Sequence, residues 1–195
     1  MKIMDREQLG REIYNVSHLT GEFLLRSGKI SNEYFDKYQF EAIPHLLKAI
    51  ANEMAKIIPS NCEVLAALEM GGIPIATALS LETNLPVVFV RKKAKEYGTR
   101  RFSEGIDITN KHIVIIEDVV TSGGQIILSA KDLRKLGAIF DRAICVIDRE
   151  EGGSEKLSEA GLKLVPLFKM SELKEWALVD SNHRPLGCEP NALTS

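Results

Sequence analysis

The chain has 195 residues, of which 45% are hydrophobic and 27% are charged, and its formal net charge at pH 7 is −2. A chain of this length and composition can bury one full core without disulfides or a structural metal. Its near-neutral charge excludes a global basic field that would attract nucleic acid or a membrane surface, so any anion-binding site must be local.

The hydrophobic pattern predicts short N-terminal elements followed by strands and helices in alternation. Residues 5–16 are typical of a short polar helix opened by Asp5, and residues 20–40 of two extended pieces around a glycine-containing turn. Further strands are expected at 64–68, 86–90, 112–116, 143–147 and 162–168, and helices at 43–58, 73–82, 124–136, 153–160 and 171–178. The polar segments 91–105 and 180–195 are assigned no element.

Strands that are continuously apolar and alternate with helices indicate a parallel sheet buried on both faces. The expected fold is therefore α/β: a doubly wound, mainly parallel five-stranded sheet with helices on both faces, with a small lobe appended. Ligands of such sheets bind outside the carboxyl ends of the strands. Functional side chains are therefore sought where the expected strands end.

Three cysteines, Cys62, Cys145 and Cys188, have no CxxC spacing, which indicates neither a disulfide framework nor a zinc site. Cys145 lies in an apolar run and is interpreted as a buried core thiol. The N-terminus has no apolar signal core, and no apolar stretch is long enough to cross a bilayer. We therefore expect a cytoplasmic protein.

The segment 117–124 joins the third of these strands to a helix, and its sequence is Glu117-Asp118-Val119-Val120-Thr121-Ser122-Gly123-Gly124. Its small residues would let backbone N–H groups converge on an anion, and the dipole of the following helix would add to the attraction. Two adjacent carboxylates suit a ligand that also offers hydroxyls or a developing positive charge, as a phosphorylated sugar does. The alternative is a plain turn with a Ser or Thr N-cap. The segment is not a Walker loop, because the Gly-Lys-Ser/Thr ending is missing.

A basic loop follows the second of these strands. Six cationic residues fall within eleven positions, opposed only by Glu96: Arg91, Lys92, Lys93, Lys95, Arg100 and Arg101. The loop is longer than most connections, which indicates function or disorder. The charges alone fit a solvated loop, a nucleic-acid patch or an anion clamp, and the adjacent phosphate-binding segment favours the clamp.

Together these features resemble the type I phosphoribosyltransferases, and among them most the orotate phosphoribosyltransferases. The resemblance extends over nearly the whole chain, and besides 117–124 it rests on four stretches: 27–29 with 34–38, 69–74, 91–99 and 148–153. It implies transfer of the phosphoribosyl group of PRPP (5-phosphoribosyl 1-diphosphate) to orotate, giving orotidine 5′-phosphate and diphosphate in pyrimidine synthesis. A phosphoribosyltransferase for another base, and a PRPP-sensing regulator without activity, are the alternatives.

The resemblance also implies the PRPP-binding residues: Gly71, Arg91, Lys92, Lys95, Tyr97, Glu117, Asp118, Val119, Val120, Thr121, Ser122, Gly123, Gly124 and Gln125. Lys95 and Asp118 would be catalytic, Lys95 at the leaving diphosphate and Asp118 at the positive charge developing on the ring. Mg²⁺ would be held mainly by the diphosphate and not directly by side chains. Some relatives have Lys near Gly71, and its absence leaves more of the diphosphate contact to the basic loop.

Orotate would contact Thr121, Arg149, Lys29 and Phe35. The planar fork of Arg suits the carboxylate of this substrate. Without the resemblance, Arg149 would be interpreted as a surface residue paired with Glu150 or Glu151. Arg26 is an alternative to Lys29, and the sequence does not decide between them.

The expected organisation is a single phosphoribosyltransferase domain over residues 1–195. A hood lobe would comprise roughly residues 1–40, with a possible contribution from the C-terminal tail, and the core roughly residues 41–179. The resemblance implies a homodimer in which the basic loop reaches the neighbouring active site. The expected partners are PRPP and orotate, with neither nucleic acid nor a membrane.

Overall fold

The computed structural model describes residues 4–25, 28–92 and 102–181. Within these ranges strands and helices alternate from the third strand onward, except that the fourth, fifth and sixth strands follow one another without a helix. In chain order they are α1 (Arg6–Ser17), β1 (His18–Leu24), β2 (Ile30–Phe35), α2 (Lys37–Ala42), α3 (Pro44–Ala55), β3 (Val64–Leu68), α4 (Gly72–Thr83), β4 (Val87–Val90), β5 (Ser103–Gly105), β6 (Ile113–Val120), α5 (Gly124–Lys135), β7 (Arg142–Asp148), α6 (Gly153–Glu159), β8 (Lys163–Lys169) and α7 (Met170–Ser181).

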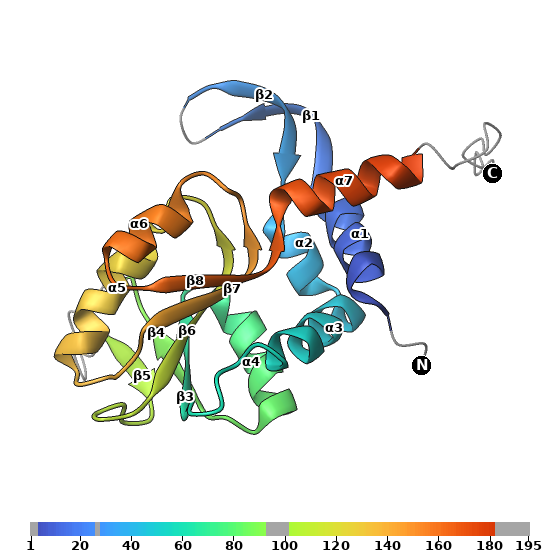
Figure 1. Ribbon diagram of the computed structural model, residues 1–195. Coiled ribbons are helices and arrows are strands. Elements are labelled where there is room, and N and C mark those ends of the chain that lie inside the picture. The colour runs from blue at the N-terminus through green and yellow to red at the C-terminus, as the bar shows by residue number, and fades with distance from the viewer. Residues whose placement is uncertain (1–3, 26–27, 93–101, 182–195) are drawn as a thin grey trace, which may run out of the picture.

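The main sheet has the strand order β5-β4-β3-β6-β7-β8 (Figure 1). The strands β4, β3, β6, β7 and β8 are mutually parallel, which confirms the predicted doubly wound α/β fold. The chain moves outward from β3 to β4 on one side and from β6 to β7 and β8 on the other. The carboxyl ends of β3 and β6 therefore form the switch point at which sheets of this kind bind ligands.

The sheet has one strand more than predicted, because β5 pairs antiparallel with the edge strand β4. This strand is only three residues long and lies inside the segment 91–105, to which no element was assigned. Three polar or small residues carry no alternating pattern. The strand is therefore defined by its pairing with β4 and not by its own sequence.

Helices cover both faces of the sheet, with α5 and α6 on one side and α3 and α4 on the other (Figure 1). Two buried apolar clusters fill the space between the layers. Ile144 and Val146 of β7 belong to one cluster and Ala143 and Cys145 to the other, because successive strand side chains point to opposite faces. The expected burial of Cys145 is confirmed, since its exposed fraction is 0%.

The hairpin β1–β2 is a separate antiparallel sheet that stands above the main sheet beside α7 (Figure 1). The two extended pieces predicted between residues 20 and 40 are thus confirmed. Helix α2, which follows β2, was not predicted, because six residues are too few to show helical periodicity. Its N-cap is Asp36, whose side chain accepts a hydrogen bond from the Tyr38 backbone N–H at 3.1 Å. The division into hood and core stays a prediction.

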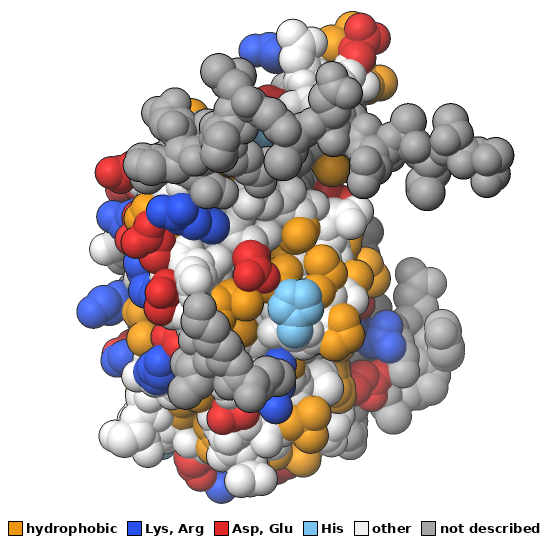
Figure 2. Space-filling model, turned by 90° about the vertical axis from the view of Figure 1, so that its right-hand side faces the viewer, with side chains coloured by type: hydrophobic (Ala, Val, Ile, Leu, Met, Phe, Trp, Pro, Cys, Tyr) orange, Lys and Arg blue, Asp and Glu red, His pale blue; other side chains and the backbone are white. Residues whose placement is uncertain are grey.

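The surface carries mixed charge. On the face shown in Figure 2, the Lys and Arg side chains lie among Asp and Glu side chains, and the described residues form no continuous basic surface there. Apolar side chains gather around a histidine in the middle of this face. Within the described part of the chain, none of the helices combines the length and the apolar character needed to cross a membrane.

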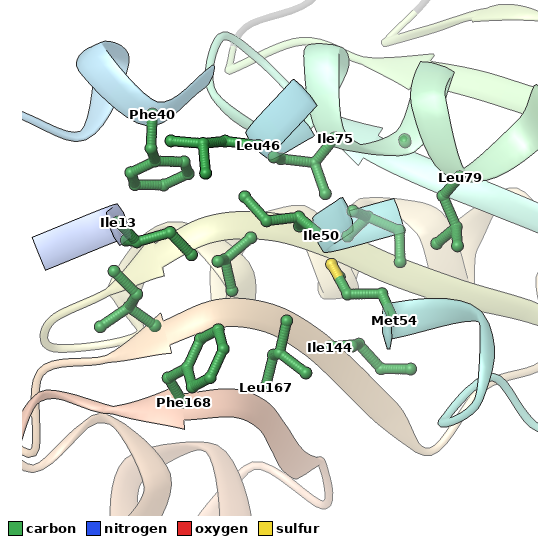
Figure 3. Close-up of a cluster of buried hydrophobic side chains, with 14 of the residues drawn as sticks. Ile13, Phe40, Leu46, Ile50, Met54, Ile75, Leu79, Ile144, Leu167 and Phe168 are labelled. Atoms are coloured by element: carbon green, nitrogen blue, oxygen red, sulfur yellow. The ribbon is translucent and has the colours of Figure 1, made fainter. Parts of the chain in front are cut away.

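The cluster on the α3–α4 side connects the N-terminal elements to the sheet. Figure 3 shows Ile13 of α1 and Phe40 of α2 in the same cluster as Ile50 of α3 and Phe168 of β8, all four with an exposed fraction of 0%. Burying one such side chain contributes roughly 1.5–3 kcal/mol. This packing fixes α2 against the core and so fixes the side chains that α2 presents to the switch point.

Candidate active site

A pocket of about 280 Å³ opens at the carboxyl ends of β3 and β6, where the strand order reverses. We call it the β3–β6 pocket. Its lining comes from α2, the loop after β3, the residues after β4, and the segment from β6 into α5: Lys37, Tyr38, Glu69, Met70, Lys92, Glu117, Val119, Val120, Thr121, Ser122, Gly123, Gly124, Gln125 and Ile126. Its position is the one predicted from the sequence.

The acidic pair lies inside strand β6, which runs to Val120 and not only to residue 116 as expected. Neighbouring strand side chains leave the strand on opposite faces, so the two residues differ in exposure although their carboxyl groups remain in contact. Glu117 lines the pocket, whereas Asp118 has an exposed fraction of 0% and lies behind the pocket wall.

Helix α5 begins at the floor of the same pocket. Its N-cap is Gly123, whose φ of 70° is in the left-handed region that favours glycine, and no side chain caps the helix. The alternative of a Ser or Thr N-cap is therefore wrong, and the exposed Thr121 and Ser122 hydroxyls are not used for capping. Uncapped N–H groups, two hydroxyls and the helix dipole together suit a phosphate group.

Behind the pocket wall, Asp118 meets two residues of α2. The Nζ atom of Lys37 lies 2.6 Å from Oδ2 of Asp118, and the Val119 backbone N–H donates to Oδ1 at 2.6 Å. Glu41, which is 7% exposed, shares a hydrogen bond with the same carboxylate. Two carboxyl groups can share such a bond only when one of them carries a proton.

The pKa values of this cluster follow from burial and from the mutual contacts. Burial first, and Asp118 second, raise the pKa of Glu41 to about 9. The same two causes raise the pKa of Glu117 well above its ordinary value. Burial acts to raise the pKa of Asp118 as well, but hydrogen bonds from Glu117, Glu41 and Lys37 outweigh it and the pKa is lowered. At neutral pH the cluster therefore contains ionised Asp118 and Lys37 beside a protonated Glu41.

Gly71 is the residue before α4, and the Asp118 carboxylate occupies the space beside it. A Cβ atom added to Gly71 would overlap Cγ and Oδ2 of Asp118 and would lie 2.8 Å from Oδ1. The backbone of Gly71 is right-handed, with φ −67° and ψ −31°, so the constraint is space and not conformation. The loop after β3 thus has no room for a side chain at this position.

The basic loop is described only at its two ends. The Arg91 backbone N–H donates to the Phe102 carbonyl oxygen at 3.0 Å, and Nε of Arg91 lies 3.6 Å from Oε1 of Glu104. The Lys92 N–H donates to Oε1 of Glu69 at 2.6 Å, which holds Lys92 at the β3–β6 pocket. Lys95 and Tyr97 lie outside the described residues, so their predicted roles stay predictions.

A second pocket of about 310 Å³ lies between the hairpin, α7 and the carboxyl ends of β7 and β8. We call it the hairpin pocket, and its lining is Tyr14, His18, Leu25, Ser31, Glu33, Tyr34, Phe35, Arg149, Glu151, Met170 and Lys174. Nε of Arg149 lies 3.1 Å from Oε1 of Glu151, one of the two pairings considered for a surface arginine. The Arg149 backbone N–H donates to the Val120 carbonyl oxygen at 2.9 Å, so the two pockets adjoin.

Comparison with known proteins agrees with this geometry. The family model of the phosphoribosyl transferase domain matches residues 37–164. The chain belongs to this family. An orotate phosphoribosyltransferase of Nocardioides sp. is 46% identical over 165 residues, 85% of this chain and 92% of that protein. An orotate phosphoribosyltransferase of Methanocella arvoryzae is 42% identical over 153 residues, 78% of this chain and 87% of that protein. The crystal structure of Mycobacterium tuberculosis H37Rv orotate phosphoribosyltransferase in complex with Fe(III) dicitrate has a TM-score of 0.79 and 24% identity, covers 86% and 98% of the two chains, and supports the fold.

In this phosphoribosyl transferase, the residues predicted to contact a base fall into different places. Phe35 and Arg149 line the hairpin pocket, and Thr121 lines the adjoining β3–β6 pocket. Lys29 is exposed at the far end of the hairpin and belongs to neither described lining. Arg26 lies outside the described residues. The base-contact roles of these residues stay predictions.

Sequence reasoning missed Lys37 and Glu41 of this phosphoribosyl transferase, because it missed α2. A signal for the helix was available: Asp36 is followed three residues later by Gln39, as in a capping box. The Gln39 side chain donates to Oδ2 of Asp36 at 2.9 Å. The ion pair with Asp118 could not be found in this way, because the two elements are far apart in the sequence.

Proposed function

We propose that this chain transfers the phosphoribosyl group of PRPP to orotate, releasing diphosphate and forming orotidine 5′-phosphate. The observation that carries the proposal is the 46% identity with an orotate phosphoribosyltransferase over 92% of that protein's length. The adjoining pockets support it, because one offers a phosphate cradle and the other an arginine.

The β3–β6 pocket would hold PRPP. Its 5-phosphate would accept hydrogen bonds from the Thr121 and Ser122 hydroxyls and from the N–H groups at the start of α5. Glu117, whose side chain lines the pocket, would bind the ribose hydroxyls. Asp118 would stabilise positive charge on the ring from behind the wall, and direct contact with the ribose would require it to release Lys37.

The diphosphate would lie toward Gly71, Lys92 and the basic loop with Lys95. Mg²⁺ is bound in such sites mainly through substrate phosphates and water, and within the described ranges no group of three or more His, Cys, Asp or Glu could hold a metal ion. Bound to the diphosphate oxygens, Mg²⁺ would neutralise the charge that develops on the leaving group. Arg91, Lys92, Lys95 and Tyr97 would add donors to the same group.

The hairpin pocket would hold orotate, with its carboxylate at Arg149 and its ring against Phe35. The bond between the anomeric carbon and the diphosphate oxygen breaks, and a ring nitrogen of orotate loses its proton and forms the new bond to that carbon. The acceleration would come from orientation and from electrostatic stabilisation. A cytoplasmic homodimer, with the basic loop reaching the neighbouring site, is part of the proposal.

The test is to incubate the protein with PRPP, Mg²⁺ and a panel of pyrimidine and purine bases, and to measure diphosphate release. Release that depends on orotate is the expected result. If diphosphate is released only with a base other than orotate, that base is the substrate and the proposal of orotate is wrong. Binding of PRPP without release for any base would refute the enzyme and favour a PRPP-sensing regulator.

A further inference from the structure

We propose that Lys37 is a further PRPP-binding residue, which Asp118 and Glu41 hold beside Gly71 so that its ammonium group binds the diphosphate of PRPP. This inference rests on the proposed function, because it assumes that the β3–β6 pocket binds PRPP. Lys37 would contact the substrate, whereas Glu41 would be a positioning residue that acts through Asp118.

The ammonium group of Lys37 is held by Asp118 and is also accessible from the pocket. Nζ lies 2.6 Å from Oδ2 of Asp118 and 5.2 Å from the centre of the Tyr38 ring. The side chain is 32% exposed and lines the pocket. An ammonium group has three donors, so the ion pair with Asp118 leaves others for an anion in the pocket.

In the β3–β6 pocket, a diphosphate beside Gly71 would need a cationic side chain to balance its charge. The described lining residues carry two cations, Lys37 and Lys92, and two acidic groups, Glu69 and Glu117. A diphosphate bears several negative charges, and its binding depends on charge-assisted donors. Lys37 therefore supplies half of the positive charge that this lining offers.

The loop after β3 cannot supply that cation itself. Its residues 69–72 include no Lys or Arg, and the Asp118 carboxylate fills the space that a side chain at Gly71 would need. The same carboxylate binds Nζ of Lys37, so the ammonium group lies next to Gly71. Lys37 thus brings from α2 the charge that the loop has no room to carry.

Glu41 keeps this arrangement from becoming too negative. Without a proton, the buried Oε1 of Glu41 has no hydrogen-bond partner among the described residues, and the Glu41 side chain faces the Asp118 carboxylate. A proton on Glu41 satisfies this contact and leaves Asp118 as the anion that pairs with Lys37. With a second anion there, the ammonium group would be drawn away from the pocket.

The experiment measures the dissociation constants of PRPP, diphosphate and ribose 5-phosphate by titration calorimetry with Mg²⁺. Replacing Lys37 by Met should weaken PRPP and diphosphate binding by roughly 10- to 100-fold, the effect of losing charge-assisted hydrogen bonds. Ribose 5-phosphate lacks the diphosphate, so its binding should change by less than about twofold. Lys37→Arg should recover part of the lost affinity, because it restores the charge.

Two further variants separate binding from folding. Lys37→Met leaves a buried Asp118 without its partner, so the double variant Lys37→Met/Asp118→Asn removes both charges and should fold but still bind diphosphate weakly. Glu41→Gln keeps a neutral donor toward Asp118 and should retain wild-type diphosphate affinity, whereas Glu41→Leu should lose it.

The inference is overturned if Lys37→Met binds diphosphate as the wild type does, or if ribose 5-phosphate binding is weakened equally. If Glu41→Leu binds diphosphate as tightly as Glu41→Gln does, Glu41 has no positioning role. The wild-type protein is assayed in parallel for orotate-dependent diphosphate release. Absence of both that release and PRPP binding in the wild type refutes the proposed function, whereas an active wild type with an unaffected Lys37→Met variant refutes only the role of Lys37.

Discussion

Replacing Gly71 by alanine tests whether the Asp118 carboxylate fills the space beside the loop after β3. The new Cβ atom would overlap Cγ and Oδ2 of Asp118 and lie 2.8 Å from Oδ1. Alanine suits the backbone of this residue, with φ −67° and ψ −31°, so backbone strain contributes nothing. The variant can fold only if Asp118 moves, and that movement breaks its ion pair with Lys37.

The expected cost follows from the burial of this pair. A buried charge that loses its partner destabilises a protein by roughly 3–5 kcal/mol, and the lower end applies because Lys37 keeps some access to water. The restricted alanine backbone returns roughly 0.4–1 kcal/mol. We therefore expect the free energy of unfolding to fall by roughly 2–3 kcal/mol, and the melting temperature by roughly 4–12 °C for a chain of this size.

Urea unfolding followed by fluorescence measures this change, because Trp176 is the single tryptophan and packs edge-on against Phe168 with ring centres 6.1 Å apart. Gly124→Ala is the matched control, since its nearest neighbour would be Oγ of Ser122 at 3.8 Å. That variant should be as stable as the wild type within roughly 0.5 kcal/mol, like most substitutions without a strained contact.

A double-mutant cycle identifies the cause. In an Asp118→Ala background the space beside Gly71 is vacant, so Gly71→Ala should then cost less than roughly 1 kcal/mol. Equal cost of Gly71→Ala in both backgrounds, or a Gly71→Ala variant as stable as the wild type, would refute the reasoning.

Three further predictions concern the active site. Lys95→Ala should lower kcat by roughly 100-fold or more while the circular dichroism spectrum stays unchanged, and near-normal turnover would remove the role assigned to Lys95. Arg149→Ala should raise KM for orotate by roughly 10-fold or more without changing KM for PRPP, and Arg149→Lys should raise KM for orotate by a smaller factor. Equal effects on KM for both substrates would contradict the role of Arg149 in binding orotate. The pKa of Glu41, about 9 against an ordinary value of 4.5, means that the folded chain holds this proton after the unfolded chain has lost it. The titration of Glu41 therefore lowers the free energy of unfolding as pH rises between these values, by at most about 1.4 kcal/mol per pH unit. In urea unfolding, Glu41→Gln should gain stability relative to the wild type from pH 6 to pH 8. Parallel pH profiles of the two proteins would exclude this titration.

Local signals in the sequence predicted most of the parallel core. The apolar runs behind β3, β6 and β7 are long enough to identify buried strands, and they alternate with helices of regular spacing. Gly137 follows Leu136, the C-cap of α5, and its φ of 81° is in the left-handed region that favours glycine at a helix end. Short elements were missed, because the three residues of β5 and the six of α2 carry too little periodicity.

The sequence by itself determined the doubly wound fold and the segment 117–124 as the phosphate-binding candidate, because strand burial, helix starts and small-residue turns are local properties of the chain. Only the tertiary structure decided how the acidic pair is used. Strand alternation turns Glu117 into the pocket and Asp118 behind its wall, where α2 brings Lys37 and Glu41 against it. Burial and ionisation there depend on contacts between elements far apart in the chain, and no local pattern records them.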